Sequence, residues 1–169
     1  GSVYHDAAQI MLRFAADMKQ KLRGDYLVKE RMYGRAVSEY REILKRKNPG
    51  KLGVQFYAAI WNNLGAAYAG MLDFRRAADC FLEAYHLTRT KETFRKYIST
   101  LPLFLSEEDY QKQLEELKAD PYLVQKIQEY NAKMCTSEEY LEEKERMHRR
   151  DRSEVVKDLK EQYCRSTKI

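Results

Sequence analysis

The chain has 169 residues, which is enough for one domain with a hydrophobic core, and 34% of them are charged while only 7 are Gly and 3 are Pro. Because helix breakers are few and helix-forming residues are abundant, the composition predicts an all-α fold. The formal net charge is +5, yet no apolar run is long enough to cross a membrane and no signal peptide is visible, so we expect no membrane partner.

The first predicted helix covers residues 4–22, where apolar side chains recur at helical spacing, and Gly24-Asp25 predicts its end. The second covers residues 28–47. It ends at Asn48-Pro49-Gly50, because Pro disfavours a helical residue before it and Gly accepts a left-handed turn.

Basic residues gather at the end of this second predicted helix: Arg41, Lys45, Arg46, Lys47 and Lys51. Cations at the negative end of a helix dipole are the common explanation. Nucleic-acid binding through the basic first third is the alternative, and it would weaken steeply with salt. We do not expect nucleic acid to be the partner, because no aromatic platform or groove-reading motif accompanies the cluster.

The central stretch, residues 58–89, predicts two helices joined by a turn at residues 71–73. The first helix carries Trp61, Leu64, Gly65 and Tyr68, and the second carries Phe74, Ala77, Phe81 and Ala84. Since Gly65 and Ala77 are small, the two helix axes can approach closely while large aromatic side chains fill the space around the contact.

This spacing, W-x2-L-G-x2-Y followed by A-x3-F-x2-A, resembles the tetratricopeptide repeat (TPR) family, whose unit is a helix–turn–helix of 34 residues. The resemblance implies an α-α superhelix of stacked hairpins. It also implies a repeat core of Trp61, Leu64, Gly65, Tyr68, Ala77, Phe81 and Ala84. Arg89 stands where the family usually has Pro, so we expect a looser boundary with the next helix.

Two further units extend the pattern. Tyr33 aligns with Phe74 at an offset of 41 residues, so we expect about seven extra residues in the first unit, placed between Arg23 and Arg31. Its first helix lacks the Trp and the Gly. A third unit is expected from a helix over residues 91–103, ended by Pro102, and a helix over residues 107–119 capped by Ser106. The predicted TPR-like repeat domain therefore spans residues 4–119.

Asp120-Pro121 predicts the start of a C-terminal part, residues 121–165. We expect residues 121–134 to form a helix that caps the last repeat, and the rest to be a charged helical extension. Self-association of this extension is left open, which would make the chain a structural assembly element that oligomerises through its C-terminal helix.

No constellation for catalysis or metal binding is visible. The three histidines and the three cysteines lie far apart, at His5, His86, His148, Cys80, Cys135 and Cys164. We therefore expect no enzyme activity, no cofactor and no metal, and the unpaired cysteines favour a cytoplasmic location. The chain opens with Gly-Ser and without an initiator Met, so we expect it to be a fragment of a longer protein.

In the TPR family the first helices of each hairpin line a concave groove that accepts an extended peptide or a partner helix. By position, the groove candidates here are Asn62, Asn63, Ala66, Arg95, Lys96 and Ser99. Asn63 and Lys96 match positions at which carboxylate-binding members place an asparagine and a basic residue, whereas Ala66 replaces their second asparagine. The resemblance thus implies a non-enzymatic protein-protein interaction scaffold for a protein or peptide partner of unknown identity.

Overall fold

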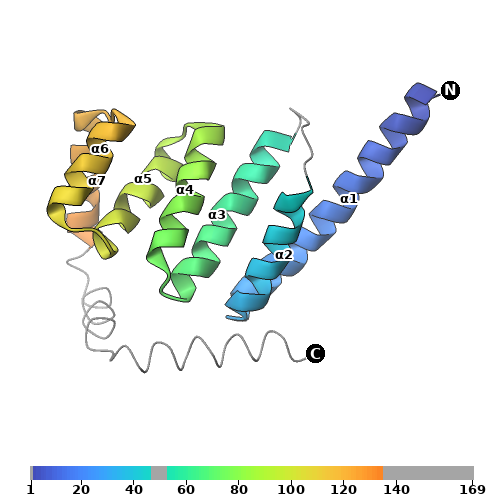
Figure 1. Ribbon diagram of the computed structural model, residues 1–169, viewed down its shortest axis with the longest axis horizontal. Coiled ribbons are helices and arrows are strands. Elements are labelled where there is room, and N and C mark those ends of the chain that lie inside the picture. Colours follow the sequence, from blue (N-terminus) through green and yellow to red (C-terminus); the bar gives the residue numbers. More distant parts are fainter. Residues whose placement is uncertain (1, 47–52, 135–169) are drawn as a thin grey trace.

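The computed structural model describes residues 2–46 and 53–134, and over that range its regular structure is entirely helical, as predicted (Figure 1). The elements are α1 (Ser2–Lys29), α2 (Tyr33–Lys45), α3 (Val54–Gly70), α4 (Phe74–Thr88), α5 (Lys91–Thr100), the short 3-10 turn η2 (Leu101–Leu103), α6 (Glu107–Leu117) and α7 (Pro121–Met134). From α1 to α6 they follow one another along the long axis of the molecule, and α7 lies at the same end of the row as α6 (Figure 1). The predicted helix end at residues 48–50 and the charged extension from residue 135 lie outside the described residues.

The core runs through the row of helices as one apolar cluster, from Leu27 on α1 to Ile127 on α7. Each helix packs on its chain neighbour in the pairs α1–α2, α2–α3, α3–α4 and α4–α5, and α7 packs back against α5. The α3–α4 contact is the most extensive.

A glycine sets the distance between α3 and α4. A Cβ atom on Gly65 would lie 2.6 Å from Cε1 of Phe81, so no larger residue fits without displacing the ring. The turn after α3 places Leu72 at φ 62°, and the amide of Asp73 donates to the carbonyl of Tyr68 at 2.9 Å. This 6→1 bond closes the end of α3 in the Schellman manner.

The α1–α2 hairpin repeats this geometry 41 residues earlier. A Cβ atom on Gly24 would lie 2.6 Å from Cε1 of Tyr40. Arg31 has φ 60°, and the amide of Met32 donates to the carbonyl of Leu27 at 2.8 Å. The predicted helix end at Gly24 is therefore wrong, because this glycine lies inside α1 and admits an aromatic ring, while the left-handed turn falls at Arg31.

Three related predictions need correction. The second helix begins at Tyr33 rather than at residue 28, because the turn at residues 30–32 intervenes. The first unit does have the glycine of the motif. Since the offset of 41 residues holds through the whole hairpin, its extra residues lie between α2 and α3, at residues 46–53, and not between Arg23 and Arg31.

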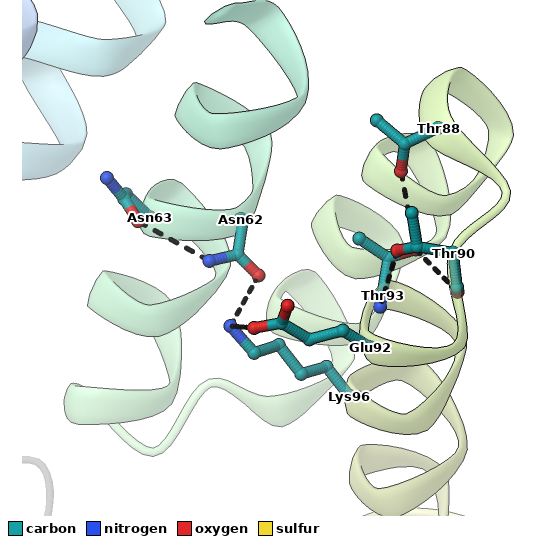
Figure 2. Close-up of polar contacts among 7 residues, drawn as sticks. All are labelled: Asn62, Asn63, Thr88, Thr90, Glu92, Thr93 and Lys96. Carbon is teal, nitrogen blue, oxygen red and sulfur yellow. Dashed lines mark hydrogen bonds and ion pairs between the residues drawn. The ribbon is translucent and has the colours of Figure 1, made fainter. Parts of the chain in front are cut away.

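The third hairpin has a tight entry. Arg89 ends α4 in a left-handed conformation, with φ 54°, and its amide donates to the carbonyl of Tyr85 at 2.7 Å. The next residue, Thr90, caps α5, because its hydroxyl accepts from the amide of Thr93 (Figure 2). The expectation of a looser boundary at Arg89 is wrong, because a left-handed residue followed by a threonine cap makes the connection that proline would otherwise favour.

The predicted caps further along the chain are confirmed. Pro102 stands just beyond the end of α5, and the hydroxyl of Ser106 accepts from the amide of Asp109 at 3.2 Å. Asp120 accepts from the amide of Tyr122 at 2.9 Å at the start of α7, whose Val124 and Ile127 are buried.

Candidate functional site

A chain of polar side chains crosses α1, α3 and α5, and we call it the polar ribbon: Lys21, Asp25, Asn62, Asn63 and Lys96. The ammonium of Lys96 donates to Oδ1 of Asn62 at 2.9 Å, and Nδ2 of Asn62 donates to Oδ1 of Asn63 at 3.4 Å (Figure 2). Nδ2 of Asn63 in turn donates to Oδ1 of Asp25 at 2.9 Å. The ribbon thus ties together three helices that are separated in sequence.

The charged groups on either side of Asn62 and Asn63 fix the direction in which the two side-chain amides point. An ammonium can only donate and a carboxylate can only accept, so Lys96 and Asp25 force both asparagine amides to point their NH2 groups toward Asp25. Each amide nitrogen carries two hydrogens and uses one within the ribbon. The hydrogens left over on Asn62, Asn63 and Lys96 suit a ligand rich in hydrogen-bond acceptors.

Asp25 anchors the polar ribbon on α1 through contacts with Tyr40, Lys21 and Asn63. Its Oδ1 accepts from the hydroxyl of Tyr40 at 2.5 Å, and its Oδ2 pairs with the ammonium of Lys21 at 2.8 Å. Burial, the hydrogen bond to Asp25 and the charge of Asp25 all raise the pKa of Tyr40, so this hydroxyl stays protonated and keeps donating. Asp25 was missed in the sequence, where it was taken for part of a helix stop. It lies at the position that Ala66 occupies in the next hairpin.

A hollow of about 350 Å³ lies between α5 and α7, and Lys96 of the polar ribbon also lines it. The residues that line this α5–α7 hollow are Phe81, Arg95, Lys96, Ser99, Thr100, Tyr130 and Asn131. The guanidinium of Arg95 lies 5.0 Å from the ring centre of Tyr130, and Nδ2 of Asn131 donates to Oγ of Ser99 at 2.9 Å. The lining carries the cations Arg95 and Lys96, and Lys96 also pairs with the exposed carboxylate of Glu92 at 3.8 Å (Figure 2). The hollow keeps an excess of positive charge through Arg95, which favours a negatively charged group.

The six groove candidates therefore divide into four sets. Asn62 and Asn63 belong to the polar ribbon, Arg95 and Ser99 to the hollow, and Lys96 to both. Ala66 is exposed and lines neither of them. Tyr130 and Asn131 were missed, because α7 carries no recognisable repeat motif that would have pointed to them.

All residues expected to form the repeat core are buried except Trp61. Leu64, Gly65, Tyr68, Ala77, Phe81 and Ala84 are buried. Trp61 is only half-buried, because its ring faces a second hollow of about 420 Å³ between α2, α3 and α4, where Arg41, Lys45 and Arg76 contribute cations.

Nothing within residues 2–46 and 53–134 groups three or more histidine, cysteine, aspartate or glutamate side chains as a metal would need. Burial raises the pKa of the Cys80 thiol to about 12, which keeps it protonated and a poor nucleophile near neutral pH. In the part of the chain that the structure describes, we find no helix with both the length and the apolar character of a membrane span.

Comparisons with models of protein families, with curated proteins and with solved structures found no match to this chain.

Proposed function

We propose that the chain is a TPR-like, non-enzymatic interaction module that binds an extended acidic segment of a partner protein. The segment lies along the polar ribbon and places a carboxylate side chain in the α5–α7 hollow. The observation that carries this proposal is the junction at Lys96, which donates to the ribbon and also lines the cationic hollow.

Contacts that recur from one hairpin to the next support the TPR-like part of the proposal. The glycine–aromatic contact and the turn of the first hairpin recur in the second at a constant offset. Lys21, Asn62 and Lys96 follow one another at offsets of 41 and 34 residues, so the ribbon draws on matching positions of three successive first helices. In stacked hairpins such positions face one side of the array.

The acidic ligand is favoured by donors and by charge. The polar ribbon offers spare amide and ammonium hydrogens that suit backbone carbonyls of an extended peptide. The hollow adds Arg95 and Lys96, and hydrogen bonds from cations to carboxylates are shorter and stronger than neutral ones. Phe81 and Tyr130 give the hollow apolar walls that suit the methylene groups of an aspartate or glutamate side chain.

An internal acidic side chain fits this site better than a C-terminal carboxylate. A carboxylate clamp needs amides that are free to converge on one anion. Here the side-chain amide of Asn63 already donates to Asp25, and Ala66 has no side-chain amide.

Selection of peptides from a displayed random library against the chain tests the proposal. We expect enrichment of Asp and Glu in extended sequences, and loss of binding when both cations of the hollow are removed in Arg95→Ala/Lys96→Ala. The matched control is Lys91→Ala, which removes an exposed cation at the start of the same helix, away from the ribbon and the hollow. Enrichment of basic or purely apolar peptides, or equal binding by the double variant, would refute the proposal.

A further inference from the structure

Exposed large apolar side chains concentrate on α1. Those on α1 are Val3, Tyr4, Ile10, Met11, Leu12, Met18, Leu22 and Tyr26, whereas the remaining described helices and turns show only Leu87, Leu103, Tyr122 and Tyr130. Tyr4 is 82% exposed and Met11 is 72% exposed. The N-terminal half of α1 projects beyond the other helices (Figure 1). Exposed apolar side chains concentrated on one helix in this way indicate an interaction site.

Part of this surface forms a regular stripe, which we call the α1 seam: Tyr4, Ala8, Met11, Ala15, Met18 and Leu22, all exposed. Successive seam residues are separated by four, three, four, three and four positions. At 3.6 residues per turn they stay within about 40° of one line along the helix, over a length of about 27 Å. This is the spacing with which one helix packs along another in a coiled coil.

The seam complements itself when two copies run antiparallel. Pairing Met11 with Ala15 of a second copy also pairs Ala8 with Met18 and Tyr4 with Leu22, because the residue numbers in every layer have the same sum. Each pairing occurs twice in the antiparallel pair, so in the four central layers a long methionine faces an alanine. A parallel pair would instead stack Ala on Ala and Met on Met, which leaves gaps in some layers and crowding in others.

Charge favours the same orientation. The C-terminal half of α1 carries Lys19 beside the seam, whereas Lys21 and Arg23 are already paired with Asp25 and Glu39. A parallel pair would bring the two copies of Lys19 together. An antiparallel pair sets them against the N-terminal half, where the charges of Asp6 and Arg13 cancel. Since the other helices pack on the C-terminal half of α1, this orientation also holds the two hairpin arrays at opposite ends of the pair.

We propose that the α1 seam is a self-association surface on which α1 of a second copy packs antiparallel. The projecting half of each α1 then covers the exposed Met18 and Leu22 of the other. The pair carries two polar ribbons, so a partner with two acidic segments would bind it with avidity.

Sedimentation of the complete chain over a concentration series tests the association. We expect a monomer–dimer equilibrium, and we expect Met11→Glu to raise the dimer dissociation constant at least about tenfold, because it places a carboxylate in the seam. Gln9→Glu adds the same charge on an exposed position outside the seam and should leave the constant unchanged. Ala15→Glu is a second seam variant, and circular dichroism shows whether each variant keeps its helicity.

Oxidative cross-linking tests the orientation. In a Cys135→Ser/Cys164→Ser background, a mixture of Met11→Cys and Ala15→Cys chains should form cross-linked pairs of unlike chains, whereas each variant alone should cross-link poorly. Cross-linking of Met11→Cys alone as efficiently as the mixture would overturn the antiparallel arrangement. A wild-type chain that remains monomeric, or a dimer that Met11→Glu and Ala15→Glu leave intact, would overturn the proposal itself.

Discussion

The first two hairpins share one backbone plan and differ in their polar chemistry. In α1–α2 the ring packed on the glycine is Tyr40, and its hydroxyl donates to Asp25. In α3–α4 the equivalent ring is Phe81, and the position equivalent to Asp25 is Ala66. The hydroxyl and its acceptor are present together in one hairpin and absent together in the other. The glycine–aromatic contact therefore sets the packing of both hairpins. Only the first hairpin adds the polar pair Tyr40–Asp25, and this pair anchors the polar ribbon.

The largest expected effect comes from filling the two glycine positions. Gly24→Ala should lower the free energy of unfolding by about 2–3 kcal/mol and Gly65→Ala by about 1 kcal/mol, because both new Cβ atoms would meet a ring at 2.6 Å. The costs differ because Tyr40 is fully buried and tied to Asp25, whereas Phe81 borders the α5–α7 hollow and can shift into it. Chemical denaturation measures both values.

Ala66→Gly serves as the control for helix propensity, since it makes the opposite exchange at an exposed position beside Gly65 and should cost about 1 kcal/mol. Equal destabilisation by Gly24→Ala and Gly65→Ala would show that the hollow gives Phe81 no freedom to move.

Exchanging the two aromatic residues should have the next largest effect. Tyr40→Phe gives the first hairpin the ring of the second and should cost about 1.5 kcal/mol, because Asp25 loses a donor at 2.5 Å. A double-mutant cycle with Asp25→Ala should show coupling between the two groups, since their interaction is direct. Phe81→Tyr provides the reverse exchange next to Ala66, and no coupling to position 66 is expected. Additive effects of Tyr40→Phe and Asp25→Ala would contradict the anchor role.

The smallest expected effect is a difference at alkaline pH between the unfolding free energies of the wild-type chain and Tyr40→Phe. The pKa of Tyr40 is raised in the folded chain by burial and by Asp25, so its contribution to stability is complete below the ordinary tyrosine pKa of about 10 and is lost as the pH rises above it. Between about pH 9 and pH 11, the unfolding free energy of Tyr40→Phe should therefore fall less than that of the wild-type chain. Parallel slopes for the two proteins would mean that Tyr40 ionises as easily when folded as when unfolded.

The sequence predicted the α3–α4 hairpin well, because Gly65, Ala77 and the aromatic residues around them carry its packing in local spacing. It failed at Gly24, because a glycine that admits a ring and a glycine that ends a helix look alike in sequence. The alignment of Tyr33 with Phe74, continued toward the N-terminus, places Gly24 on Gly65 and would have corrected the error.

The candidate site was predictable only where it follows the repeat register. Asn62, Asn63 and Lys96 were found from their positions on successive first helices. Asp25 escaped notice because its role depends on α1 continuing past Gly24. Tyr130 and Asn131 escaped because they reach the hollow through the packing of α7 on α5, which no motif in the sequence encodes.

The most direct test of the central claim follows the side-chain amides of the site by NMR while a selected acidic peptide is added. The account predicts that the NH2 signals of Asn62, Asn63 and Asn131 shift with the same saturation curve, while that of Gln111 on α6 stays in place. Shifts confined to the indole signal of Trp61, in the hollow between α2 and α4, would contradict the proposed site.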